Sequence, residues 1–307
     1  MSTLSAHVED YLRLRRALGY KLERAGHLLP TLVGHLEASG SATLTTELAI
    51  SWARLPATAR PNYWAARLSI ARSFARYLQT IEPATEIPPE AVFPARRHRP
   101  APYLWSQQDI ERLLDCARAL RPRLRAATHE ALFGLIAVSG MRVGEAVGLD
   151  RDDFAFDTGV ITIRHAKFDR SRLVPLHATT TAALRTYATE RDRLCPARAS
   201  TAFFVSGAGA ERLGRGDVAK TLRRITTAMG LRTESVHPTV HQLRHSFAVR
   251  TLVDWHRSGA RVDEHIATLS TYLGHVSPAD TYWYLSASPE LMGLAAERLD
   301  IRFGAER

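Results

Sequence analysis

The prolines between residues 83 and 102 constrain this chain more than any other feature. Six fall within twenty residues, and they are Pro83, Pro88, Pro89, Pro94, Pro100 and Pro102. Proline lacks a backbone N–H and prevents a helix from continuing. Arg96, Arg97, His98 and Arg99 lie among these prolines. The sequence therefore predicts an extended, basic linker that divides the chain near residue 100.

The length fits this division, because 307 residues are enough for two ordinary domains. We expect a helical domain over residues 1–95, a basic proline-rich linker over 96–105 and a second domain over 106–307. The longest apolar run, Ala131 to Val138, is too short to span a bilayer, and the first ten residues do not resemble a signal peptide. Two cysteines, Cys116 and Cys195, cannot form a disulfide framework. These features predict a soluble, cytoplasmic protein with no membrane partner.

The charge of the chain indicates a polyanionic partner. Lys and Arg number 41 against 31 Asp and Glu, which gives a net charge of +10. Nucleic acid is the commonest partner of such a chain, although an ordinary enzyme can also be basic. The basic residues include only three lysines, which are Lys21, Lys167 and Lys220.

The first domain is predicted to be helical from its apolar spacing. Its segment Asn62 to Leu78 places Arg67, Arg72 and Arg76 beside aromatic residues. This pattern suits a helix that packs on one face and contacts DNA phosphates with the other. It suits a core face opposite a solvated basic face equally well.

The second domain is predicted to be mostly helical, with a small β element. Ser106 and Asp109 form a capping pattern at the first helix. Short strands are expected at 160–163 and 172–176, and a third at 203–206. Helices are expected near 106–120, 124–139, 179–194, 217–229, 239–257, 263–272 and 289–299. The fold class is therefore mainly α with a small β element.

Five segments place polar or cationic groups in apolar surroundings. In SGMRVGEAVGLD, residues 139–150, Arg142 lies at a predicted helix start, where a guanidinium and free N–H groups suit a phosphate. The segment RHAKFDRSRLVPL, residues 164–176, contains Lys167 beside a hairpin turn. His275 follows a helix end in LGHVS, and TYWYLS, residues 281–286, contains three aromatic residues.

The fifth segment is HQLRHSF, residues 241–247. His241 and Arg244 share one helix face, and His241 and His245 are four residues apart. A zinc-protease pattern would require Glu at the second position, where this chain has Gln242, and no carboxylate supplies a third ligand. We therefore expect no metal site, and we expect His245 to be a packing residue.

Taken together and in order, these segments resemble the tyrosine recombinase, or phage integrase, family. The matching phrases are SGMRVGEAVGL, HQLRHSFA, LGH and a tyrosine nine residues after His275. The resemblance covers the whole chain and implies the simple two-domain type, without an arm-binding domain. It implies a helical, SAM-like core-binding domain that binds DNA, followed by an α+β catalytic domain.

The resemblance also implies the role of each residue in strand cleavage. Tyr284 would attack the scissile phosphate and form a 3′-phosphotyrosine, with Tyr282 as the rival nucleophile. Arg142 and Arg244 would hold the phosphate oxygens, and His241 and His275 would hydrogen-bond the phosphate. Lys167 would protonate the leaving 5′-oxygen, and Glu145 would support Arg142. No cofactor is needed. The DNA-binding residues expected outside this group are Arg67, Arg72, Arg76, Arg96, Arg97 and Arg99.

The expected partner is double-stranded DNA with an inverted-repeat core site. The resemblance implies a homotetramer on DNA, or an assembly with related recombinases, that acts through a Holliday junction. The helix at 289–299 would dock on a neighbouring protomer or within its own chain. The nucleophile segment favours integration, excision or transposition of a mobile element. A type IB topoisomerase and a non-catalytic DNA-binding protein of the same fold are the alternatives.

Overall fold

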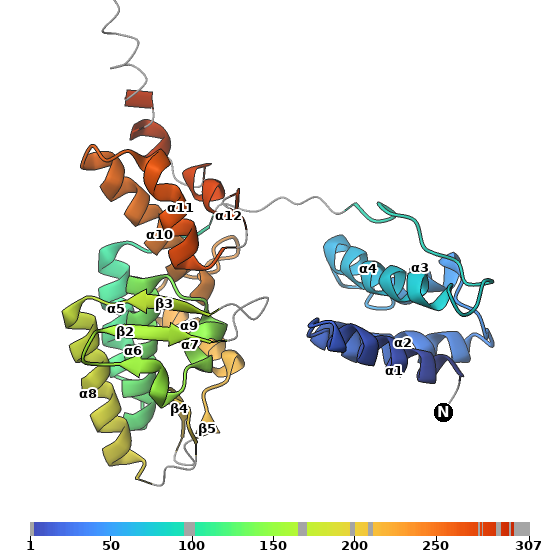
Figure 1. Cartoon of the computed structure of the whole chain (residues 1–307), viewed down its shortest axis with the longest axis horizontal. Helices are drawn as coiled ribbons and strands as arrows, with labels where there is room; N and C mark the ends of the chain where they lie inside the picture. The colour runs from blue at the N-terminus through green and yellow to red at the C-terminus, as the bar shows by residue number, and fades with distance from the viewer. Residues whose placement is uncertain are drawn as a thin grey trace, which may run out of the picture. The chain divides into compact units, whose positions relative to one another are not determined.

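The computed structural model divides the chain into two compact units, Met1–Arg99 and Pro100–Arg307 (Figure 1). The description covers residues 3–94, 102–164, 171–196, 200–207, 211–275, 277, 279–286, 290–294 and 296–297. Helices dominate both units, and strands occur only in the second among these residues. The prediction of a mainly α chain with a small β element is therefore confirmed.

The first unit is a four-helix domain in which one pair of helices covers the other (Figure 1). Its helices are α1 Thr3–Ala17, α2 Glu23–Ala38, α3 Thr46–Arg54 and α4 Pro61–Leu78. The Thr45 side chain caps α3, and Pro61 occupies the first turn of α4, where no backbone donor is required. Leu29, Trp52 and Phe74 are fully buried in the shared core.

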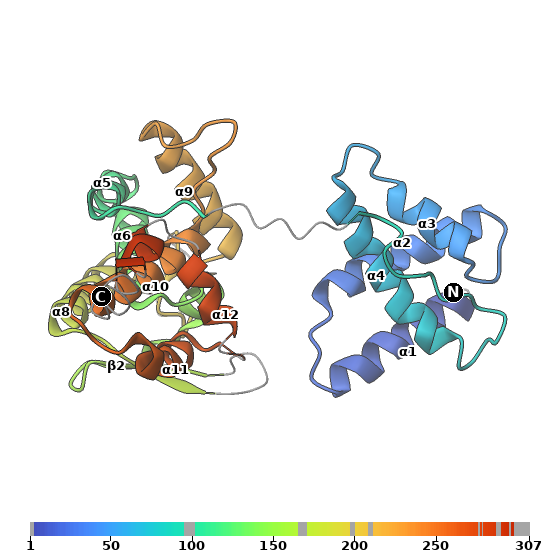
Figure 2. The same ribbon diagram turned by 90° about the horizontal axis from the view of Figure 1, so that it is seen from above.

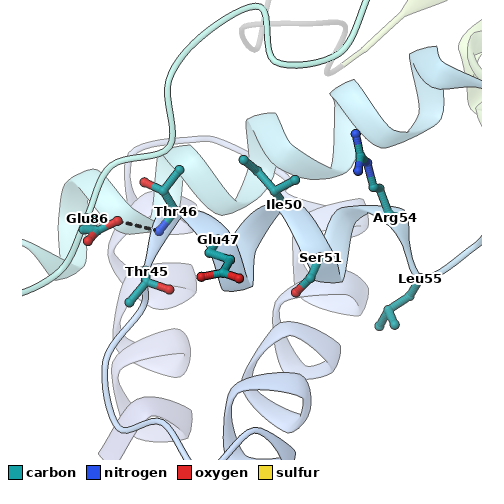
Figure 3. Close-up of a pocket in the computed structure, with 8 residues that line it drawn as sticks. All are labelled: Thr45, Thr46, Glu47, Ile50, Ser51, Arg54, Leu55 and Glu86. Carbon is teal, nitrogen blue, oxygen red and sulfur yellow. Dashed lines mark hydrogen bonds between the residues drawn. The ribbon is translucent and has the colours of Figure 1, made fainter.

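The proline-rich segment that follows α4 packs on this first unit as far as residue 94. The carboxylate of Glu86 accepts a hydrogen bond of 2.8 Å from the Thr46 backbone N–H at the start of α3, beside a pocket along that helix (Figure 3). The Arg72 guanidinium donates to the carbonyl oxygens of Pro88 and Pro89. Phe93 is buried against Trp64. These contacts hold residues 83–94 in the first unit, ahead of the linker predicted at 96–105.

The far end of the predicted linker packs on the second unit. Trp105 is buried, and its backbone N–H donates to the Ser246 hydroxyl at 2.7 Å. The Tyr103 hydroxyl donates to Asp109 at 2.8 Å. The segment 95–101, which includes Arg96, Arg97 and Arg99, lies outside the described residues.

In the second unit, other helices pack around α6 on several sides. α5, α8 and α10 pack against it, and Leu132, Phe133 and Ile136 are fully buried. The helices described in this unit are α5 Gln107–Arg118, α6 Arg123–Ser139, α7 Val143–Gly148, α8 Ala178–Leu194, α9 Arg215–Ala228, α10 Val240–Arg257, α11 Val262–Leu273 and α12 Ala279–Tyr282. Single 3₁₀ turns occupy η1 Arg151–Asp153 and η2 Trp283–Ser286.

The β structure of this unit consists of two small antiparallel sheets. The larger has the order β1-β2-β3, with Ile161 opposite Val174 and Ile163 opposite Arg172. The strands are β1 Phe154–Ala155, β2 Val160–Ile163, β3 Arg172–Pro175, β4 Val205–Ser206 and β5 Glu211–Arg212. Residues 164–171 join β2 to β3, so the predicted hairpin is present, and Lys167 lies in this connection but outside the described residues.

The C-terminal part of the second unit has its own apolar cluster. α10, α11 and η2 contribute to this cluster, and α12 lies next to α11 (Figure 2). Residues 290–294 and 296–297 are helical, and the rest of the helix expected at 289–299 lies outside the described residues. Leu291 is buried in the cluster, and Glu290 pairs with Arg257 at 2.6 Å. Leu291 therefore packs within its own chain.

Within the described residues, no helix is both long and apolar enough to cross a membrane.

Candidate active site

Arg142 lies where α6 gives way to α7. Gly140 ends α6 with a φ of +62°, and a Cβ atom there would lie 2.5 Å from the Phe247 ring. This left-handed residue turns the chain so that Arg142 is the first residue before α7, as predicted. The Glu145 carboxylate accepts hydrogen bonds from the Arg142 backbone at 3.0 Å and from its guanidinium at 2.8 Å. The expected contact between Glu145 and Arg142 is therefore present.

α10 supplies His241, Arg244 and His245. Gln242 accepts a hydrogen bond of 2.6 Å from the Thr239 backbone N–H, so this residue caps the helix. Arg244 is 1% exposed, and it donates to the carbonyl oxygens of Gly140 at 2.7 Å and Leu273 at 2.8 Å. The buried guanidinium therefore joins the ends of α6 and α11.

His275 follows the C-terminal end of α11. Gly274 ends the helix with a φ of +69°, and the His275 backbone N–H returns to the Ser270 carbonyl at 2.9 Å. The His275 Nδ1 atom lies 2.7 Å from the hydroxyl of Thr281, which is fully buried. The sequence did not indicate a role for Thr281, because its hydrogen-bond partner is defined only by the fold.

The structure places Tyr284, rather than Tyr282, among the other site residues. Tyr284 is 3% exposed, whereas Tyr282 is 51% exposed. The Tyr284 ring lies 5.9 Å from the His275 ring and 5.3 Å from the His245 ring, measured between centroids. His245 also contacts the ring of His241 at 4.5 Å, as expected of a packing residue.

The electrostatics of the site are dominated by guanidinium groups. Burial lowers the pKa of Arg244 to about 10, and the charge of Arg142 acts in the same direction, whereas the neighbouring Tyr284 and Glu145 act against it. Burial also lowers the pKa of His275 to about 4, and the charges of Arg244 and Arg142 lower it further. The pKa of His241 is lowered by the same causes in the same order. Both imidazoles are therefore neutral at pH 7, beside two cations suited to an oxyanion.

Arg172 belongs to this site, although the sequence indicated only its place in a strand. It lies at the start of β3 and donates two hydrogen bonds to Glu145, at 3.0 and 2.8 Å. Its Nε–H donates to the Tyr272 carbonyl at 3.1 Å. The one available signal was its position directly after the β2–β3 connection that contains Lys167, but its partners are 27 and 100 residues away. Among the described residues, no group of three or more His, Cys, Asp or Glu side chains could hold a metal ion.

The arginines of α4 do not form the free basic face that was expected. Arg67 is buried, donates to the Trp52 carbonyl at 2.9 Å and lies over the Trp52 ring. The Arg67 guanidinium is therefore part of the core and not of an exposed phosphate-binding face. Arg72 is partly buried and bonded to the segment after α4. Arg76 is exposed and lies 3.4 Å from Glu90.

Known proteins share this fold and sequence pattern. The model of the Phage integrase family matches residues 105–290. The chain is 44% identical over 310 residues to "Putative integrase/recombinase y4rB" of Sinorhizobium fredii, covering 99% of both chains. It is 29% identical over 285 residues to "Tyrosine recombinase XerD" of Brucella melitensis, covering 90% of this chain and 85% of that protein. The lambda integrase tetramer bound to a Holliday junction has the same fold, with a TM-score of 0.63 and 17% identity over 92% of this chain and 77% of that one.

The fold and these relatives point to one class of proteins, the tyrosine recombinases, which are site-specific DNA recombinases. The family match covers more than half of the 307 residues, and the chain belongs to the phage integrase family. It is therefore a tyrosine site-specific DNA recombinase.

Proposed function

We propose that this recombinase cleaves DNA by attack of the Tyr284 hydroxyl on a backbone phosphate. A bond forms between the tyrosine oxygen and phosphorus, and the bond to the 5′-oxygen breaks. The products are a 3′-phosphotyrosine and a free 5′-hydroxyl. The placement of Tyr284, buried beside His275 and Arg244 while Tyr282 is exposed, is the observation that carries this proposal.

Each of the surrounding groups has a different role in this reaction. Arg142 and Arg244 supply permanent positive charge for the non-bridging phosphate oxygens. His241 and His275 are neutral before DNA binds, so one of them can accept the proton of the tyrosine while the other hydrogen-bonds the phosphate. An arriving phosphate favours this step, because its negative charge raises the pKa of a nearby imidazole.

Lys167 is proposed as the acid that protonates the leaving 5′-oxygen. Lysine releases a proton far more readily than arginine, which suits this role. The Arg172 end of the β2–β3 connection lies at the site, next to Glu145. Lys167 belongs to the same connection, which is the structural reason for including it in the site.

The phosphotyrosine bond retains the energy of the broken phosphodiester, so a 5′-hydroxyl from a second DNA duplex can displace the tyrosine without ATP. Two such exchanges in sequence produce and resolve a Holliday junction. We propose a tetramer on inverted-repeat core sites for this exchange, and the lambda integrase tetramer bound to a Holliday junction supports it by analogy. The relative named as an integrase/recombinase supports a role in moving a mobile element.

The proposal is tested by covalent capture, which works even though the target sequence is not specified in advance. The protein is incubated with a library of short duplexes of random sequence, each with one nick from which a cleaved strand end can diffuse away. Complexes that survive detergent are sequenced. We expect wild-type protein and Tyr282→Phe to capture one inverted-repeat sequence and Tyr284→Phe to capture none. Capture by Tyr284→Phe would show that the nucleophile is another residue.

The same captured sequence separates recombination from its alternatives. Two copies on one plasmid should exchange strands, whereas relaxation of a supercoiled plasmid without exchange would indicate a topoisomerase. The absence of any covalent adduct would indicate a non-catalytic DNA-binding protein.

A further inference from the structure

The Glu145 carboxylate links two guanidinium groups in the second unit. Its Oε1 atom accepts hydrogen bonds from Arg142 at 2.8 Å and from Arg172 at 3.0 Å. Its Oε2 atom accepts from the Arg142 backbone at 3.0 Å and from Arg172 at 2.8 Å. Among the described residues, the hydrogen bonds of this carboxylate therefore go to one arginine that is proposed to bind phosphate and to one that is not.

The same arginines meet again at the C-terminal end of α11. The carbonyl oxygens in the last turn of a helix lack partners within the helix and favour cations. Here three successive carbonyls each accept from a different arginine: Tyr272 from Arg172, Leu273 from Arg244 and Gly274 from Arg142. His275 follows directly, so its backbone begins where these three guanidinium groups converge.

The surroundings of Arg172 require both the planar shape and the charge of its guanidinium group. A Cβ atom on residue 274 would lie 2.5 Å from the Arg172 Nη1 atom, and glycine leaves that space open. Arg172 uses Nε, Nη1 and Nη2 for three separate acceptors. The compact ammonium group of lysine cannot reproduce this planar, forked arrangement.

Arg172 also maintains the charge of Glu145. Burial alone would raise the pKa of Glu145, but the hydrogen bonds and charge of Arg172, followed by the hydrogen bonds from Arg142, outweigh burial and bring the pKa to about 2. The Arg172 and Glu145 side chains are only 12% and 11% exposed, so little solvent screens the pair. Without Arg172, the buried carboxylate would retain Arg142 as its nearest cation and would bind a proton more readily.

We propose that Arg172 is a positioning residue for strand cleavage, which fixes Arg142 through Glu145 and fixes the start of the His275 segment through the Tyr272 carbonyl. It does not touch the DNA phosphate. This inference rests on the proposed phosphotyrosine chemistry, because it assigns a function to the orientation of two groups in that reaction.

The test compares Arg172→Gln with wild-type protein on the nicked duplex that wild-type protein captures from the random library. We expect the first-order rate of adduct formation at saturating protein to fall about 100-fold, because small displacements of catalytic groups have effects of this size. Affinity for the duplex, measured in a Tyr284→Phe background, should stay within about threefold.

Arg191→Gln is the matched control. Arg191 is buried, bonds the carbonyl oxygen of Phe203 and pairs with Asp192, so it makes the same kinds of contact outside the site. A general loss of stability would affect both variants, whereas loss of positioning should slow Arg172→Gln alone. Equal rates for these two variants would overturn the inference.

A double-mutant cycle with Glu145→Gln tests whether Arg172 acts through that carboxylate. We expect the double variant to be about as slow as the slower single variant. Fully multiplicative effects would contradict the inference.

Two further measurements distinguish the possible failures. If wild-type protein forms no adduct on any duplex, the proposed function fails and not the role of Arg172 alone. If Arg172→Gln does not fold, as judged by thermal unfolding, Arg172→Lys replaces it because lysine retains the charge and the aliphatic stem. A wild-type rate for Arg172→Lys would overturn the positioning role, and a slower rate with unchanged affinity would support it.

Discussion

His275 shows how a single residue depends on its surroundings in this recombinase. Its ring lies against Tyr284 and bonds Thr281, while burial and the neighbouring arginines disfavour its charged form. Folding therefore holds a neutral imidazole among cations. Such a group accepts a proton readily only when an anion offsets those cations, which couples its chemistry to the presence of DNA.

This arrangement predicts how stability changes with pH. The pKa of His275 falls from 6.5 to about 4 on folding, so the unfolded chain binds more protons between these values. Stability is therefore lost as the pH falls from about 6.5 towards 4. We expect His275→Gln to reduce this loss, as measured by thermal unfolding at several pH values. His27→Gln, at an exposed position of α2, is the control and should retain the wild-type slope. Identical slopes for all three proteins would contradict the lowered pKa.

Residue identity alone indicated part of this site and missed another part. Arg142, His241, Arg244, His275 and Tyr284 lie in short segments whose residue types and spacing match the chemistry, and the fold brings these side chains together. Arg172 and Thr281 were missed because their contacts are made by the fold and leave no pattern in the sequence. Arg67 was assigned to DNA because an arginine among aromatic residues suits a phosphate-binding face, but such a pattern also permits a buried guanidinium over Trp52.

At the scale of secondary structure, chain breaks and caps were the most reliable signals. Ser106 caps α5 through the Asp109 backbone, and Gly274 ends α11, both as predicted. The strands β1 and β5 were not predicted, since such short elements give no usable periodicity. The sequence indicated the start of α7 at Arg142 but not where this short helix ends.

The turn between α6 and α7 is expected to be sensitive to a single methyl group. Gly140→Ala would place a Cβ atom against Phe247 at a positive φ, so we expect the free energy of unfolding to fall by about 1–3 kcal/mol. Gly148→Ala is the matched control, because a Cβ atom there meets nothing within 4 Å. Its stability should stay the same or rise by up to about 1 kcal/mol. Equal effects in urea unfolding would show that the close approach at Gly140 is unimportant.

Two side chains of the helix around Leu291 allow two contacts to be tested separately, packing within the chain and docking on a neighbouring protomer. Leu291 is buried in its own unit, so Leu291→Ala should lower stability by about 2–5 kcal/mol.

Met292 is 58% exposed and is the better candidate for a contact between protomers. We expect Met292→Glu to leave folding and single-site adduct formation unchanged and to slow exchange between two sites about tenfold. Wild-type exchange by Met292→Glu would argue against docking through this face.

At the scale of the whole molecule, the proline-rich segment is shared between the two units. Glu86, Arg72 and Phe93 hold residues up to 94 against the first unit, and Trp105 holds the other end in the second. Proline content indicated where the chain divides, but it could not show that most of these prolines lie on a folded surface. The packing of these prolines depends on the hydrogen bonds that Arg72 donates to the carbonyl oxygens of Pro88 and Pro89. Composition alone does not reveal such contacts.

The basic residues between the units, Arg96, Arg97 and Arg99, are the remaining proposed phosphate contacts of this segment. Replacing all three by Gln should weaken binding to any duplex, cognate or not, because phosphate contacts carry no sequence information. The slope of log affinity against log salt concentration should fall by up to about 3, one for each lost contact. Fluorescence anisotropy over a salt series measures both quantities, in a Tyr284→Phe background that prevents cleavage. Arg72 and Arg67 are bonded within the first unit, so their substitution should affect stability rather than this slope. A slope that is unchanged in the triple variant would remove the segment from the DNA-binding surface and leave the two folded units to supply it.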